Sequence, residues 1–88
     1  MHTDEYEISV WREIALCRKV IERLKNALQE KEARYGMATK DFLSGFKAGL
    51  FPELNHDFLL WSEESHELHN WQHKLREYEE AFQMLKNI

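Results

Sequence analysis

The chain has 88 residues, of which 43% are hydrophobic and 32% charged, with three glycines, one proline and a formal net charge of −4. This length corresponds to a single domain, and the scarcity of glycine, proline and β-branched residues argues against a sheet protein and favours an all-α fold. The negative net charge argues against a nucleic-acid-binding protein, because phosphate contacts need clustered lysine and arginine.

The cellular compartment is inferred from the ends of the chain and from its one cysteine. Residues 1–5 are acidic and include no apolar run, so we expect no signal peptide. No stretch approaches the roughly 20 apolar residues of a membrane span. Cys17 has no partner for an internal disulfide, which favours a reducing compartment. We therefore expect a cytoplasmic protein that does not enter a membrane.

The first predicted element is a long helix over about residues 4–34, a stretch free of proline and glycine. Its apolar residues recur at alternating spacings of three and four, which predicts a heptad seam on one side of the helix. The seam consists of Val10, Ile14, Cys17, Ile21, Leu24, Leu28 and Tyr35, with Lys31 as its one polar member. Trp11, Leu16, Val20 and Ala27 extend the apolar surface beyond this seam.

A corner and a short helix follow. Gly36 fits the left-handed position that ends a helix, and Thr39 is predicted to cap the next one, over about residues 39–48. That helix presents Phe42, Leu43 and Phe46. Because Gly45 costs about 1 kcal/mol relative to alanine inside a helix, we expect close packing against its backbone.

The last predicted element is a second long helix, over about residues 56–86, with Asn55 as its cap. Its seam again follows three- and four-residue spacing and consists of Trp61, Glu64, Leu68, Trp71, Leu75, Tyr78, Phe82 and Leu85. Two long helices joined by a compact corner should fold back on each other, so the sequence predicts one antiparallel helical-hairpin domain over residues 1–88.

One hairpin cannot cover all of these aromatic residues, each of which tends to bury about 150–250 Å². We therefore expect a homodimer in which two hairpins form a four-helix bundle. The predicted dimer core comprises Trp11, Ile14, Ile21, Leu24 and Leu28 from the first helix and Leu68, Trp71, Leu75, Tyr78 and Phe82 from the last.

Three histidines are the most conspicuous candidates for metal chemistry. His66, His69 and His73 share one helical face, as ligands of a transition metal would. That face lies opposite the apolar seam, where nothing would orient the rings, so we interpret it as a solvent face and expect no metal or cofactor.

No other arrangement points to catalysis, and we expect a protein that is not an enzyme. Cys17 lies on the apolar seam without a nearby histidine and is interpreted as a packing residue. Glu64 interrupts the second seam, and two interpretations are open. The favoured one places its carboxylate in water at the edge of the bundle, and the other pairs it with Lys31 or another cation.

The corner carries a resemblance to a known family, over the segment RYGMATKDFLSGFKAGLFPELNHDFLLW, roughly a third of the chain. It resembles small bacterial and archaeal helical proteins that are candidate antitoxin components of toxin–antitoxin pairs. The matching residues are Tyr35, Gly36, Met37, Phe42, Gly49, Asp57, Phe58 and Trp61. The chain departs from the pattern at Ala38 and at Phe51-Pro52.

The resemblance implies an antitoxin-like protein that binds and neutralises a partner toxin, with the corner as a docking site. The residues themselves favour a simpler role for the corner, a small core that closes the hairpin, made of Tyr35, Met37, Phe42, Phe46, Phe58 and Trp61. Residues 53–88 carry eight acidic and three basic residues, a net charge of −5, which favours a basic partner protein. The alternative is a self-associating structural or adaptor bundle without a dedicated partner.

Overall fold

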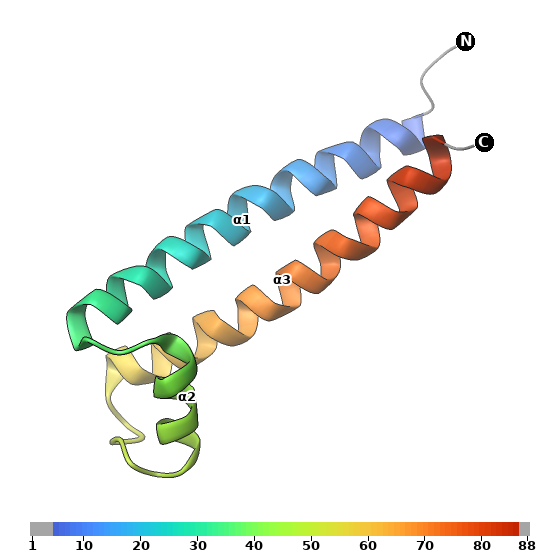
Figure 1. Ribbon diagram of the computed structural model, residues 1–88. Helices are drawn as coiled ribbons and strands as arrows, with labels where there is room; N and C mark the ends of the chain where they lie inside the picture. Colours follow the sequence, from blue (N-terminus) through green and yellow to red (C-terminus); the bar gives the residue numbers. More distant parts are fainter. Residues whose placement is uncertain (1–4, 87–88) are drawn as a thin grey trace.

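The computed structural model describes residues 5–86, which form three helices: α1 (Glu5–Tyr35), α2 (Thr39–Lys47) and α3 (His56–Lys86). Figure 1 shows α1 and α3 running antiparallel along the length of the molecule, with α2 at the end where the chain turns back. The all-α hairpin is confirmed, and the helix boundaries predicted within residues 5–86 lie within about one residue of those observed. The predicted start of the first helix, residue 4, lies outside the described residues.

The predicted seam of α1 is buried against α3, with the exception of Tyr35 at its end, which is 37% exposed. Val10, Ile14, Cys17, Ile21, Leu24 and Leu28 are all buried, as their alternating spacing requires of a helix packed along one side. Cys17 is fully enclosed, and this burial raises the pKa of its thiol. Cys17 therefore packs as a small hydrophobic residue.

The seam of α3 is covered less completely than that of α1. Along His56–Lys86, Trp61 is the only fully buried residue, and Trp71, Leu75, Tyr78 and Phe82 are half-buried. Two helices contact each other along a single line, so large aromatic side chains on α3 extend past α1 on either side. The hairpin thus leaves apolar surface on its second long helix.

The favoured interpretation of Glu64, a carboxylate in water at the edge of the bundle, is wrong. Oε1 of Glu64 accepts a hydrogen bond of 2.5 Å from the Lys31 ammonium, and the two side chains are only 16% and 8% exposed. Both residues occupy seam positions at the same level of the hairpin. A lysine alone there would bury an unpaired charge, and the carboxylate from the facing helix compensates it.

The corner is built on Gly36, whose φ of 62° is the left-handed conformation predicted for it. The prediction that Thr39 caps α2 is wrong. Ala38 occupies the cap position without a side-chain hydrogen bond, and the carboxylate of Glu32 instead accepts from the Thr39 N–H at 2.7 Å. Glu32 projects from the last turns of α1, so a side chain from the preceding helix satisfies the start of α2.

The connection from α2 to α3 matches its prediction closely. A Cβ on Gly45 would lie 2.5 Å from the Phe51 ring, which explains why glycine occupies this position inside α2. The Asn55 side chain accepts a hydrogen bond of 3.1 Å from the Phe58 N–H and so caps α3. Within residues 5–86, none of the helices combines the length and the hydropathy that crossing a bilayer requires.

Candidate functional site

An aromatic cluster fills the corner between the three helices. Phe42 and Trp61 are both buried and stack in parallel with ring centroids 4.0 Å apart. Phe46 and Phe58 lie against Phe42 at centroid distances of 5.2 and 5.4 Å. Met37 packs against the same cluster. Aromatic contacts of this kind add to the free energy gained by burial, so the cluster holds α2 against the hairpin.

Two hydrogen bonds that share Thr39 lie beside the aromatic cluster. The Trp61 indole N–H donates to the Thr39 hydroxyl at 2.9 Å, and the Thr39 N–H donates to Glu32. One residue of α2 is thus bonded to both long helices. Because Trp61 is buried, its indole N–H needs this acceptor, and loss of the Thr39 hydroxyl would leave it unsatisfied.

Tyr35 joins the end of α1 to the start of α3. Its ring contacts Phe58 and Trp61, and its hydroxyl donates to the Asp57 carboxylate at 2.5 Å. Arg34 donates to the same carboxylate at 2.8 Å. These bonds from Tyr35 and Arg34 lower the pKa of Asp57, and the bond to Asp57 raises the pKa of the Tyr35 phenol. The corner residues therefore form a closed, internally bonded end to the hairpin.

The three histidines lie exposed on α3. The His73 Nε2 is 2.9 Å from the Glu77 carboxylate one turn further on, and this ion pair forms when the ring is protonated. Between Glu5 and Lys86, no group of three or more histidine, cysteine, aspartate or glutamate side chains is arranged to hold a metal ion. His66, His69 and His73 thus share one side of α3, but they do not converge on a common point.

The residues of the predicted dimer core differ in burial and fall into three groups. Ile14, Ile21, Leu24 and Leu28 are buried between the two helices of one chain, so their burial needs no second copy. Trp11, in contrast, is 57% exposed. The remaining members, Leu68, Trp71, Leu75, Tyr78 and Phe82, are half-buried along α3.

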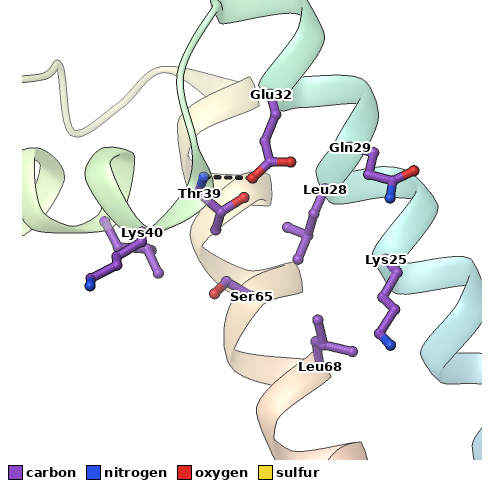
Figure 2. Close-up of a pocket in the computed structure, with 9 residues that line it drawn as sticks. Lys25, Leu28, Gln29, Glu32, Thr39, Lys40, Ser65 and Leu68 are labelled. Atoms are coloured by element: carbon purple, nitrogen blue, oxygen red, sulfur yellow. Dashed lines mark hydrogen bonds between the residues drawn. The ribbon is translucent and has the colours of Figure 1, made fainter.

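A groove of about 550 Å³ lies where all three helices meet, beside the corner. Its apolar lining comes from Leu28 on α1, Leu43 on α2 and Leu68 on α3. Figure 2 shows Lys25 and Lys40 on opposite sides of the groove, and the bond between Glu32 and Thr39 at its edge. Neither helix periodicity nor any motif predicts this groove, because its shape depends on where α2 packs against the two long helices.

Comparison of the chain with protein-family models, with curated proteins and with solved structures found no match in any of the three.

Proposed function

We propose that the chain is a non-enzymatic, cytoplasmic protein-interaction module of the antitoxin type, which binds a basic partner toxin and masks its working surface. The observation that carries this proposal is the distribution of charge on α3. Asp57, Glu64 and Glu79 are neutralised by cations of α1. The acidic surplus therefore resides in carboxylates that point away from the hairpin.

These outward carboxylates include Glu63, Glu67 and Glu80, all of them exposed. Within residues 5–86, none of the three forms an ion pair. Unpaired charges of one sign attract a partner of the opposite sign and accelerate its association. A basic, RNA-binding toxin surface fits such a helix face, which would compete with the RNA for the same cations.

The proposal predicts that a small basic protein is encoded next to this chain, and the test is to co-express the two. The proposal expects that protein to arrest growth alone and to be neutralised when both are produced. Charge reversal at Glu63 and Glu67 should weaken neutralisation, and reversal at Glu53, exposed in the loop before α3, serves as the matched control. A soluble, co-expressed pair that still arrests growth would exclude the antitoxin role.

A second candidate function is a self-associating bundle, and the exposed aromatic surface favours it. Trp11 and Met84 are 57% and 70% exposed, and three aromatic residues of α3, Trp71, Tyr78 and Phe82, are only half-buried. Exposed apolar surface of this kind is typical of an interface. In this form two hairpins pair into a four-helix bundle, and sedimentation at micromolar concentration should give twice the chain mass of 10.7 kDa. A monomeric species would exclude it.

A further inference from the structure

Trp11 and the corner groove open on the same side of the hairpin. Trp11, Arg18, Lys25 and Glu32 follow one another at seven-residue intervals, so all four lie on one side of α1. Lys25 and Glu32 line the groove, whereas Trp11 and Arg18 line a separate hollow near the other end of the molecule. One flank of the hairpin therefore presents a protruding indole at one end and a concave surface at the other.

The indole end of this flank is apolar and carries one nearby carboxylate. Trp11 lies beside Ile8 and Phe82, and Glu7 precedes it by one helical turn. Among the described residues, no cation pairs with Glu7. Tryptophan is enriched among the residues that contribute most to binding when it enters a pocket of a partner.

The groove at the other end of the flank has an apolar lining and two lysines, which complement the apolar indole and the carboxylate. It is an open groove of about 550 Å³ whose apolar lining comes from Leu28, Leu43 and Leu68. Lys25 and Lys40 flank it (Figure 2). Neither ammonium group is paired with a carboxylate within the described part of the chain. The groove thus fits an apolar side chain accompanied by a carboxylate.

We propose that the occupant of this groove is Trp11 of a second copy of the chain, with Glu7 of that copy beside Lys40. The inference rests on the self-associating form of the proposed function and specifies its geometry. Both halves of the contact are present on every chain, so a single two-fold axis forms the contact twice. Such an isologous pair closes on itself and gives a dimer rather than a filament.

The positions of the two features determine the orientation of the dimer. About 18 residues separate Trp11 from Gln29 in the groove, which is roughly 27 Å along the helix. A two-fold axis perpendicular to α1 near Val20, midway between them, places each Trp11 at the groove of the other copy. An axis parallel to the helices would instead place Trp11 against Trp11 and leave both grooves empty. The two hairpins therefore lie side by side with their corners at opposite ends.

The first experiment compares the dimer dissociation constant of the wild type with those of Trp11→Ala and Leu16→Ala by sedimentation velocity. Leu16 is a matched control, because it is 47% exposed and lies five residues after Trp11, on another side of α1. Loss of one major interface residue raises a dissociation constant about 30-fold, and the dimer contains this contact twice, so we expect an increase of up to about 1,000-fold for Trp11→Ala and of less than about 3-fold for Leu16→Ala. Circular dichroism confirms that each variant remains helical.

The second experiment exchanges the charges. Glu7→Lys and Lys40→Glu should each weaken the dimer, and the double variant should recover most of the wild-type affinity, because each copy then supplies the reversed pair. A wild-type chain that stays monomeric overturns the inference. A dimer that tolerates Trp11→Ala, or a charge exchange without recovery, also overturns it, but leaves self-association itself intact. Toxin neutralisation is measured separately, so its outcome bears on the antitoxin role alone.

Discussion

Removing one partner of the Lys31–Glu64 ion pair should cost far more stability than removing both. The ammonium lies 2.5 Å from the carboxylate, and the side chains are largely shielded from water. An unpaired charge left in a fully buried site costs about 3–5 kcal/mol. Because part of the Glu64 side chain still meets solvent, we expect about 2–3 kcal/mol for Lys31→Met or Glu64→Leu alone. In the double variant the two apolar side chains pack together, and the free energy of unfolding should return to within about 1 kcal/mol of wild type.

Urea and thermal melts followed by circular dichroism, at one fixed protein concentration, measure this cycle. In a domain of this size 1 kcal/mol shifts Tm by about 4–8 °C, so each single variant should melt roughly 10–20 °C below wild type. The exposed Arg18–Glu79 pair, with side chains 64% and 43% exposed, is the control, and Glu79→Leu should cost less than about 1 kcal/mol. A double variant that loses the sum of the two single effects would show that the charges are not coupled, and would refute the reasoning.

Three further predictions concern the corner. Because Gly36 has a φ of 62°, Gly36→Val should destabilise the protein by about 1–2 kcal/mol in urea melts and Gly36→Asn by less, and equal effects would contradict the backbone argument. Thr39→Val removes the acceptor of the Trp61 indole N–H and should lower the free energy of unfolding by about 1–3 kcal/mol, whereas Thr39→Ser should have a stability close to that of the wild type. A serine variant as unstable as the valine variant would exclude the hydrogen bond as the cause. The lowered pKa of Asp57 means that its stabilising contribution is complete above its unfolded pKa of about 4 and is lost as pH falls through the folded value, so acid melts of Asp57→Asn should lack this component. In the same variant the raised pKa of Tyr35, followed by ultraviolet absorbance, should return toward its ordinary value, and an unchanged Tyr35 titration would contradict the bond between them.

Features that depend on neighbours in the sequence were predicted well. The extent of the helices, the buried seam of α1, the conformation of Gly36 and the cap at Asn55 follow from local spacing and local chemistry. The close packing at Gly45 also followed, because a glycine inside a helix has a cost that packing must offset. The identity of the residue that packs against Gly45, Phe51, could not be predicted, since nothing in the local sequence indicates which side chain contacts this glycine.

Features that depend on contacts across the fold were missed or misjudged. Glu32 takes over the capping of α2 that was assigned to Thr39, because α1 happens to end where its carboxylate reaches the first N–H. The pairing of Glu64 with Lys31 depends on the register between the two long helices, which the periodicity of each helix alone does not fix. The corner groove was missed for a related reason, since it requires the position of α2.

The uneven distribution of aromatic packing has a consequence for the order in which the hairpin forms and opens. At the corner, the Trp61–Thr39 bond joins residues 22 apart in the chain, whereas the Arg18–Glu79 contact toward the other end joins residues 61 apart. Closing the longer loop costs about 0.9 kcal/mol more in chain entropy, and fewer buried rings are present there to offset it. The contacts between α1 and α3 should therefore form first at the corner and extend outward from it. On opening, they should be lost first at the opposite end. A contact between Trp11 and the groove of a second copy would stabilise the end of the hairpin away from the corner, which is the least stable part of a single chain. Association and the completion of folding would then be one process.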